Sequence, residues 1–504
     1  MPVKRTGFVL LTWLFVLGCT RVNHAPDAPA APTGPSVVTQ DSLAGYTSAA
    51  TDLDGDSVSI RFDWGNGDTS EWSSYVGSGV KVLKNYTWHD IGTDSVRAQA
   101  MDRDSLTSDW SLPKPVQVQT PADWWGKTFG GASDDYGYSV QRTSDGGYVI
   151  AGRTGSSGAG GDDVWLVKTD AIGHEVWDRT YGGAGGDIGY SVERTPDGGY
   201  VIAGSTESYG AGDWDVWLIK TDADGNKLWD RTFGGANGDE GYSVQPTSDG
   251  GYVVVGRTSS SGAGQDDVWL IKTDADGNRV WDRTFGGEVS DYGNSVRQTS
   301  DGGYVIAGTT WTYGVGWDDV WLIKTDAAGN RLWDRTFGGG FYDRGHSVQL
   351  TPDGGYIIAG STQSWGAGDW DVWLIKTDAS GYAVWDRTFG GTNADEGHSV
   401  QRTSDGGYVI AGHTYSYGAG WGDVWLIKTD ANGNKVWDRT FGGKRYDVGE
   451  SVQPTSDGKY VIAGYTWSYG AGYGDFWLVK APAPETTAVL PTPAARLYRS
   501  AQPE

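Results

Sequence analysis

The pattern of apolar and polar positions divides most of this 504-residue chain into short strand-like runs. Two kinds of run, such as YVIAGST and DVWLIKT, are apolar on both faces of a strand, because apolar side chains occupy consecutive positions. A third kind, such as KLWDRTF, alternates, and a fourth, such as YSVERT, is short and contains small residues. Turn sequences such as PDGG and ADGN separate the runs and predict antiparallel hairpins. Each group of four runs therefore predicts a four-stranded antiparallel sheet.

The group of four runs recurs with a constant period. The motif W-x-[KR]-T-[FY]-G-G returns every 52 residues, at Trp125, Trp177, Trp229, Trp281, Trp333, Trp385 and Trp437. An antiparallel sheet with two apolar faces must be covered on both. Repeated sheets cover one another in a β-propeller, where small inner strands surround an axis and more polar strands lie outside. The sequence therefore predicts an all-β fold with a seven-bladed β-propeller.

The two ends of the repeat region indicate how the last blade is completed. The run DFWLVK (475–480) is followed by APAPETT, and no outer-strand run comes after it. An extra outer-strand run, WWGKTFGG (124–131), precedes the first copy. We therefore predict a propeller over residues 121–480 that is closed by the strand at 124–131. The 52-residue unit resembles a Trp-rich repeat of uncharacterised bacterial and archaeal surface proteins, a resemblance that implies no activity.

Residues 36–120 do not share the repeat. They hold short alternating runs, and FDWGNGDTSEWS (62–73) and YTWHDIGTDSVRAQAMDRDSLTSDWS (86–111) resemble the signature stretches of PKD domains. The resemblance implies a small Ig-like β-sandwich that acts as a spacer or adhesion module. The acids Asp52, Asp54 and Asp56 could hold Ca²⁺ or form a solvated Asx turn, and the turn is favoured.

The N-terminus has the features of a targeting segment. Lys4 and Arg5 precede an apolar run (7–18) that is too short to span a bilayer. The run ends in VLGC, which resembles a bacterial lipobox, so residues 1–19 are expected to be a lipoprotein signal with Cys19 as the lipidated residue. An ordinary signal peptide with a chance cysteine is the alternative. Residues 20–35 are expected to be a Pro/Ala-rich tether and residues 481–504 a Pro-rich disordered tail.

The resemblance to a lipobox implies a protein of the cell envelope that is held to the membrane through its lipid anchor only. Thr20, not Asp, follows Cys19, and by resemblance to lipoprotein sorting this favours the outer membrane or the cell surface. The formal net charge of -25 would repel a phosphate backbone, so no nucleic-acid partner is expected. The six histidines show no HExxH motif, and the chain has no G-x-S-x-G motif and no phosphate loop. We therefore predict no catalytic residues, no metal and no cofactor.

Two recurring acids are assigned to structure. The acid that opens each ADGN-type turn is followed two residues later by Ile172 in one copy and Ala328 in another, which cannot be calcium ligands. A second acid, Asp135 in the first copy, is expected to accept hydrogen bonds within its own loop. Six residues that differ from their equivalents in other copies are attributed to surface drift: Arg153, Glu207, Arg257, Arg344, His413 and Arg445.

The remaining informative variation lies in the loops between the second and third strands. In an up-and-down sheet these loops share one face with the variable triplets that follow FGG. The loops of copies four to seven are rich in aromatic residues, and we take these as candidate ligand-binding residues: Trp311, Tyr313, Trp317, Trp365, Trp370, Tyr415, Tyr417, Trp421, Trp467, Tyr469 and Tyr473. Exposed rings can stack on sugars or anchor a protein partner, and the alternative is that they only pack the loops together.

The prediction for function is a non-enzymatic binding or scaffolding lipoprotein that recognises a glycan or protein partner through this face. One alternative is a propeller enzyme, either a carbohydrate hydrolase or lyase or a quinone-dependent dehydrogenase. Another is a purely structural surface component.

Overall fold

The computed structural model describes residues 23–39, 43–88, 92–119 and 124–482, all of them in strands, turns and loops. The chain divides into two compact units, Met1–Gln119 and Thr120–Glu504. Within the described ranges, no helix could span a membrane. Cys19 with the rest of the predicted signal (1–19), and the predicted tail beyond residue 482, lie outside the described residues.

The N-terminal unit is a two-sheet sandwich. Its strands are β1 (Val37–Thr39), β2 (Leu43–Ser48), β3 (Ser59–Asp63), β4 (Val82–Thr87), β5 (Gly92–Met101) and β6 (Lys114–Gln119). One sheet has the order β1-β6-β5-β3, and β2 pairs with β4 in the other. A single core joins the two sheets, because Tyr46 and Val82 of one pack in the same buried cluster as Phe62 and Val96 of the other.

The predicted tether is wrong where the structure describes it. Residues 23–35 lie along the N-terminal unit, where the backbone N–H of Ala30 donates to the carbonyl of Ala49 at 3.1 Å. Pro26, Pro29 and Pro32 are buried. Prolines at every third position fall on one side of an extended chain with three residues per turn, so this side packs and the residues between donate hydrogen bonds. Composition alone suggested a linker, but the spacing of the prolines produces a packed segment.

The second unit begins with β7 (Trp125–Phe129) and continues with copies of a four-strand pattern. The first, inner strands are β8 (Asp135–Arg142), β12 (Asp187–Arg194), β16 (Asp239–Pro246), β20 (Asp291–Gln298), β24 (Asp343–Leu350), β28 (Asp395–Arg402) and β32 (Asp447–Pro454). The second strands are β9 (Tyr148–Thr154), β13 (Tyr200–Thr206), β17 (Tyr252–Thr258), β21 (Tyr304–Thr310), β25 (Tyr356–Thr362), β29 (Tyr408–Thr414) and β33 (Tyr460–Thr466).

The third and outer strands complete these sheets. The third strands are β10 (Asp163–Thr169), β14 (Asp215–Thr221), β18 (Asp267–Thr273), β22 (Asp319–Thr325), β26 (Asp371–Thr377), β30 (Asp423–Thr429) and β34 (Asp475–Ala481). The outer strands that follow them are β11 (Glu175–Tyr181), β15 (Lys227–Phe233), β19 (Arg279–Phe285), β23 (Arg331–Phe337), β27 (Ala383–Phe389) and β31 (Lys435–Phe441).

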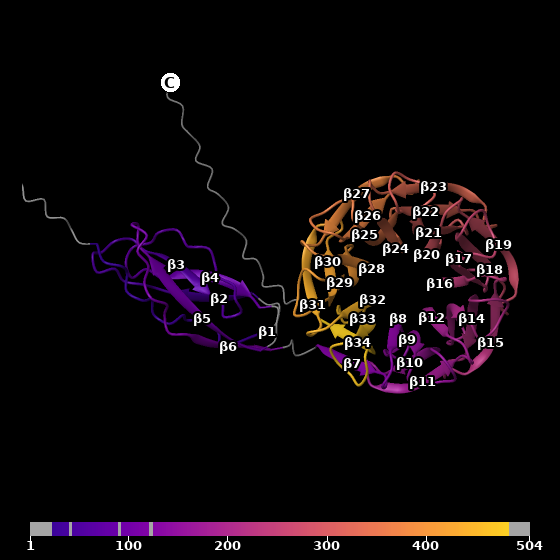
Figure 1. Cartoon of the computed structure of the whole chain (residues 1–504), viewed down its shortest axis with the longest axis horizontal. Helices are drawn as coiled ribbons and strands as arrows, with labels where there is room; N and C mark the ends of the chain where they lie inside the picture. The colour runs from indigo at the N-terminus through magenta and orange to yellow at the C-terminus, as the bar shows by residue number, and fades with distance from the viewer. Residues whose placement is uncertain (1–22, 40–42, 89–91, 120–123, 483–504) are drawn as a thin grey trace, which may run out of the picture. The chain divides into compact units, whose positions relative to one another are not determined.

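All neighbouring strands within these sheets are antiparallel, and β34 takes its outer partner from the start of the unit. Phe476 pairs with Phe129 and Lys480 with Trp125, so β7 is the fourth strand of the sheet β32-β33-β34-β7. The sheets surround a common centre, with β8, β12 and β16 toward it and β11, β15 and β19 at the periphery (Figure 1). We number the sheets one to seven by their inner strands, from β8 to β32.

The apolar cores of this unit lie between consecutive sheets. Trp217 and Ile202 of sheet two pack with Leu166 and Val149 of sheet one, and the other neighbouring sheets repeat this arrangement. The same kind of cluster joins sheet seven to sheet one, where Phe476 packs with Trp165. The second and third strands are apolar on both faces because both faces are covered.

A serine on each inner strand links that strand to the next sheet. The backbone N–H of Val192 donates to Oγ of Ser139 at 3.2 Å, and equivalent bonds of 3.2–3.4 Å follow from sheet to sheet. The seventh bond runs from Val140 of sheet one to Ser451 of sheet seven. The small residues of the YSV run therefore form hydrogen bonds between strands that lie close together.

Sheets one to six each carry a buried lysine near the end of the third strand, and the equivalent Lys480 of sheet seven is half-buried. Lys220 is 4% exposed, and its Nζ donates to the carbonyl of Thr221 and to Asp197, both at 2.8 Å. Although desolvation raises the pKa of Asp197, hydrogen bonds from Lys220 and Thr195 outweigh it and lower that pKa to about 2. The ion pair joins the third strand to the turn between the first and second strands.

Candidate functional site

The loops between second and third strands lie against the connections between sheets, as the alternation of strand direction predicts. The N–H of Asp187, at the end of one connection, donates to the carbonyl of Asp162 in such a loop at 2.6 Å. The N–H of Glu207 donates to the carbonyl of Gly186 at 2.8 Å. We call the surface formed by these loops and connections the loop face.

Two aspartates per sheet fix the backbone of the loop face. In sheet two, Oδ2 of Asp187 accepts the N–H of Gly183 at 2.9 Å and the hydroxyl of Ser208 at 2.6 Å. Oδ2 of Asp215 accepts the N–H of Ala211 at 2.6 Å. Asp187 and its equivalents therefore bind their own loops, as the sequence indicated for Asp135.

The acids of the predicted turns are structural as well. Oδ1 of Asp222 accepts the N–H groups of Asp224 and Asn226, and Gly225 has a φ of 78°. In the N-terminal unit, Oδ1 of Asp52 accepts the N–H groups of Asp54 and Asp56 in the same manner, which is the expected Asx turn.

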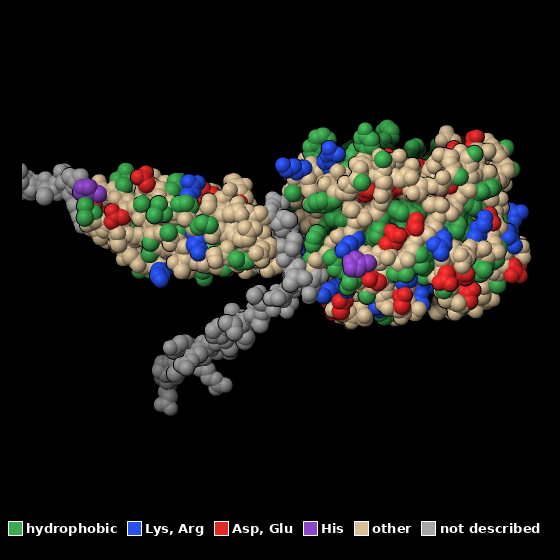
Figure 2. All heavy atoms as spheres, turned by 90° about the horizontal axis from the view of Figure 1, so that it is seen from below, with side chains coloured by type: hydrophobic (Ala, Val, Ile, Leu, Met, Phe, Trp, Pro, Cys, Tyr) green, Lys and Arg blue, Asp and Glu red, His purple; other side chains and the backbone are tan. Residues whose placement is uncertain are grey.

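Most of the candidate aromatic side chains are exposed on the loop face. The exposed fraction is 80% for Trp421, 72% for Tyr473 and 66% for Trp317. It is 53% for Trp365 and 46% for Trp311. Figure 2 shows hydrophobic side chains gathered along the upper edge of the repeat unit, whereas charged side chains predominate along the lower edge. The same loops also hold Trp370, Tyr415 and Trp467. Of these three, Tyr415 and Trp467 are exposed and Trp370 is half-buried.

Three of the candidate tyrosines also support their loops. The hydroxyls of Tyr313, Tyr417 and Tyr469 donate to the carbonyls of Gly286, Gly390 and Gly442 at 2.7–2.9 Å. Tyr209 of sheet two makes the same bond. At these positions the alternative interpretation, loop packing, accounts for the hydroxyl, although 39–45% of each residue is exposed.

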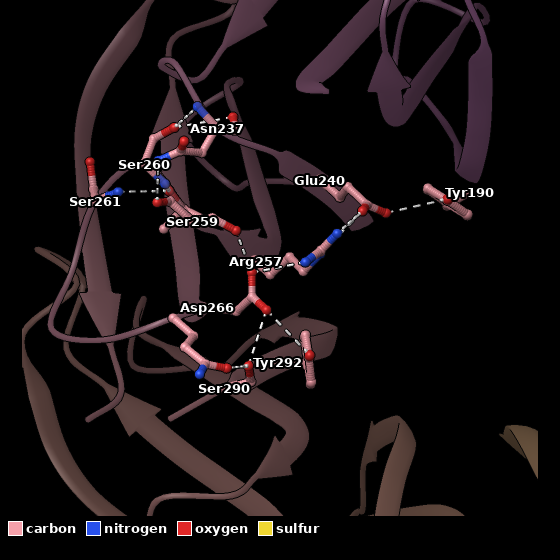
Figure 3. A network of polar contacts seen from close by, with 12 residues as sticks. Tyr190, Asn237, Glu240, Arg257, Ser259, Ser260, Ser261, Asp266, Ser290 and Tyr292 are labelled. Carbon is pink, nitrogen blue, oxygen red and sulfur yellow. Dashed lines mark hydrogen bonds and ion pairs between the residues drawn. The ribbon is translucent and has the colours of Figure 1, made fainter. Parts of the chain in front are cut away.

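A polar network that the sequence reasoning missed lies beneath the loops (Figure 3). Arg257, near the end of β17, donates from Nη1 to Oδ1 of Asp266 at 2.8 Å and from Nε to Glu240 at 3.1 Å. The other carboxylate oxygen of Asp266 accepts the hydroxyls of Ser290 and Tyr292 at 3.1 and 3.3 Å. The attribution of Arg257 to surface drift is wrong, because this side chain is hydrogen-bonded to two acids of its own sheet, and one of them, Asp266, extends the network to Tyr292 of the next sheet.

Charge in this network is balanced by close contacts. Burial works against the charged form of Arg257, but Tyr242, Glu240 and Asp266 outweigh it and raise the pKa of the guanidinium. Burial also opposes the charge of Asp266, but hydrogen bonding from Ser259 and the nearby arginine lower the pKa of this carboxyl. Both groups are therefore ionised at neutral pH.

The equivalent positions differ in sheets one and four. Arg153 of β9 pairs with Asp162, which repeats the Arg257–Asp266 arrangement. In sheet four the arginine is replaced by Thr309, and the acid, Asp318, accepts Nε of Arg344 from sheet five at 3.1 Å. The guanidinium of Arg344 lies 4.9 Å from the ring centre of Trp370. Surface drift is therefore the wrong interpretation for Arg153 and Arg344 too.

A pocket of about 330 Å³ lies beside Asp318. Its inner-strand lining consists of Tyr242, Tyr292, Asn294, Arg344 and His346. Thr309, Trp311 and Asp318 complete it from sheet four. We call it the inner-strand pocket, and one of the predicted aromatic residues, Trp311, belongs to it.

A row of histidines continues from the pocket across sheets five and six. The ring centres of His346 and His398 are 5.6 Å apart, and those of His398 and His413 are 5.2 Å apart. Burial lowers the pKa of His398, but Glu450, whose carboxylate is 2.6 Å from Nδ1, outweighs it and raises the pKa to about 9. Burial and the charge of His398 lower the pKa of His346 and His413 to about 3. One charged imidazole thus lies between two neutral ones.

These side chains could have been found by comparing equivalent positions along the inner strands. The position that holds Tyr138 in sheet one holds Tyr190, Tyr242, Asn294, His346, His398 and Glu450 in the others. Most positions of the repeat hardly vary, so this change from tyrosine to histidine and glutamate is a signal. It was passed over because small residues were expected near the axis.

Comparisons with known proteins find similarity to parts of the chain. No family model matches the chain. The regulatory protein FlaEY of Caulobacter vibrioides is 26% identical over 249 residues, which are 42% of this chain and 25% of FlaEY. The chain therefore spans about a quarter of the length of that relative.

Among solved structures, the PKD domain of an M14-like peptidase from a Thermoplasmatales archaeon is 33% identical, with a TM-score of 0.19. The match covers 20% of this chain and 100% of that domain. A CARDB domain from Pyrococcus furiosus is 20% identical over 20% of this chain and 100% of its own length, with a TM-score of 0.16. The structure itself combines a two-sheet sandwich with repeated four-stranded sheets.

Proposed function

We propose that the chain is a non-enzymatic binding protein of the cell envelope that recognises a glycan or protein partner through its loop face. The repeat unit is, in this proposal, a closed seven-bladed β-propeller. Closure is supported by the pairing of β7 with β34, by the core that Phe476 shares with Trp165, and by the seventh serine bond from Val140 to Ser451.

One observation carries the binding proposal: the aromatic rings are not needed to fold the loops that bear them. The loop of sheet one, GSSGAGGD, has no aromatic residue. It nevertheless makes the framework bonds, from Ala159 to Asp163 at 2.6 Å and from Ser156 to Asp135 at 2.8 Å. Trp317 and Trp421 therefore expose apolar area that the fold does not require, and such area is typical of sites that contact sugars or protein partners.

Glycan arrays and affinity measurements on the purified chain test this function. Trp317→Ala and Trp421→Ala should each weaken binding of a ligand found on the array by about tenfold, because each ring offers stacking area. Tyr382→Ala is the matched control, since Tyr382 is 60% exposed in a turn on the opposite face. Unchanged affinity in both tryptophan variants, or equal loss in the control, would show that the loop face is not the binding surface.

The proposal includes anchoring of the chain by a lipid on Cys19. It is supported by the position of this single cysteine directly after a short apolar run that follows two basic residues. Labelling of the chain with a fatty-acid analogue in a bacterial host tests it. Cys19→Ser should lose the label and leave the membrane fraction, and retention of the label in this variant would exclude Cys19 as the acceptor.

A further inference from the structure

We propose that the inner-strand pocket binds one neutral sugar residue through two adjacent hydroxyl groups. The inference rests on the proposed binding function and assigns it a specific subsite. It arises from a difference between neighbouring sheets that share one framework.

The pocket exists because a long side chain is replaced by a short one. In sheets one and three, Arg153 and Arg257 extend from the end of the second strand to the acid of the following loop. The equivalent residue of sheet four is Thr309, which lines the pocket and makes no such pair. The space that an arginine occupies in the other two sheets is thus open beside Asp318.

The substitution leaves hydrogen-bonding capacity in the pocket. Asp266 binds partners with both carboxylate oxygens, whereas Asp318 uses only Oδ2, for Arg344. The side chain of Asp318 is 1% exposed, and its Oδ1 is buried with no hydrogen-bond partner among the described groups. Nε2 of His346 is also buried, and it too has no hydrogen-bond partner among the described groups. Buried polar atoms are nearly always paired, so a ligand group at this place would satisfy them.

Arg344 supplies the complementary donors. Its Nε is held by Asp318, and its guanidinium faces the ring of Trp370, which fixes the plane of the group. Within the described part of the chain, the structure gives its two Nη groups no acceptor, and the residue lines the pocket. A hydroxyl group is both a donor and an acceptor. Two adjacent hydroxyls can therefore donate to Oδ1 of Asp318 and accept from an Nη of Arg344.

Trp311 provides an apolar surface at the same place. It lines the pocket and is 46% exposed, and among the described side chains it stacks on no other aromatic ring. The apolar face of a pyranose can pack against such a ring while its hydroxyls reach the Asp318–Arg344 pair.

Charge and size narrow the class of ligand. Asp318 and Arg344 neutralise each other, and His346 is uncharged at neutral pH because burial and the nearby cations lower its pKa to about 3. The whole chain carries a net charge of -25, which disfavours an anion. A volume of about 330 Å³ lies at the lower end of the range for small-molecule sites, so it suits one sugar residue rather than a long segment.

Calorimetry and saturation-transfer NMR with methyl glycosides of glucose, galactose and mannose test the proposal on the full chain. At least one of the three should bind with a dissociation constant below about 10 mM. The methyl glycoside of the corresponding uronic acid, which carries a negative charge, should bind at least tenfold more weakly. Thr309→Arg should abolish binding, because it rebuilds the arrangement of Arg257. Asp318→Asn should weaken it by at least tenfold, since a charge-assisted hydrogen bond is lost. Val315→Ala is the matched control and should bind as the native chain does, because Val315 is 83% exposed in the same loop and is not among the residues that line the pocket.

The outcomes separate this proposal from the proposed function. Binding of a methyl glycoside that is lost in Thr309→Arg but kept in Trp421→Ala assigns the ligand to the pocket. If the native chain, Thr309→Arg and Asp318→Asn bind the methyl glycoside with equal affinity, the pocket proposal is overturned. Tighter binding of the uronic acid than of the neutral sugar would overturn it too. If Thr309→Arg melts at a lower temperature than the native chain, its loss of binding could come from unfolding. In that case the affinity of Asp318→Asn decides whether the pocket binds the glycoside. An array ligand that depends on Trp421 with no methyl glycoside bound refutes the pocket and leaves the proposed function standing.

Discussion

Replacement of Trp125 by alanine tests whether the repeat unit closes on itself. Trp125 belongs to β7, at the start of the unit, yet its ring lies 6.2 Å from that of Tyr148 in sheet one. Trp177, in the outer strand of sheet one, lies 6.2 Å from Tyr200 in sheet two. Both rings also cover the turn glycine of the next sheet. The two tryptophans thus have the same surroundings, although only Trp177 lies in a sheet built from consecutive strands.

The expected magnitude follows from partial burial. Both side chains are half-buried, so truncation removes roughly 100 Å² of buried apolar area from each. At about 25 cal/mol per Å², each variant should lose about 2.5 kcal/mol of unfolding free energy. For a unit of this size the unfolding entropy converts that loss into a decrease of roughly 3 °C in melting temperature.

Differential scanning calorimetry of the full chain measures the decrease, and the transition of the repeat unit is the one to compare. Trp125→Ala and Trp177→Ala should melt at the same temperature, below the native chain. Val176→Ala is the control, because Val176 is 59% exposed in the same outer strand as Trp177. If Trp125→Ala melts with the native chain while Trp177→Ala does not, β7 contributes nothing to the last sheet and the closed propeller is wrong.

Three further predictions concern buried charge and backbone packing. Lys220→Met should lower the free energy of unfolding by about 1 kcal/mol at pH 7. The pKa of Asp197 is lowered from 3.8 to about 2, so the ion-pair part of this loss is present above pH 3.8. Urea titrations should show that this part disappears as the pH falls toward 2. Gly204→Ala should cost about 3 kcal/mol, since a Cβ would meet a backbone oxygen at 1.8 Å, whereas Gly238→Ala, with nothing within 4 Å, should be neutral in the same melting assay. The imidazole of His398 should titrate near pH 9 when followed by NMR. Its contribution to stability is complete below pH 6.5 and is lost as the pH rises through 9. A titration midpoint below pH 6.5 would contradict the raised pKa.

The architecture could be predicted because its causes are local and repeated. Runs that are apolar on both faces, such as DVWLIKT, require cover on both sides, and a 52-residue period supplies it. The placement of the loop aromatics followed from strand alternation alone. The exposure of Trp317 and Trp421 did not follow, because a tryptophan in a glycine-rich loop can pack inward or outward at similar cost.

The polar network could not be predicted because it depends on the reach of side chains between sheets. Arg257 of β17 donates to Glu240 of β16 and to Asp266 of a loop, and Asp266 in turn accepts from Tyr292 of the next sheet. No spacing in the sequence marks such contacts. The packed segment with Pro26 and Pro29 was missed for a related reason. Composition predicted a linker, whereas the three-residue spacing places the rings on one buried side.

The loop backbone repeats from sheet to sheet, but the side chains on it do not, and this difference determines how many ligands one chain should bind. The bonds that shape the loops, such as those of Asp187 and Asp215, recur from sheet to sheet, so the backbone around the unit is nearly symmetric. The side chains at the loop face are not symmetric, because arginines fill the space in sheets one and three and Thr309 leaves it open in sheet four. A symmetric lectin would bind one ligand in each sheet. Within the described sheets, the opening beside Thr309 meets an exposed tryptophan and an acid whose Oδ1 has no partner, so a sugar bound there should saturate at one molecule per chain.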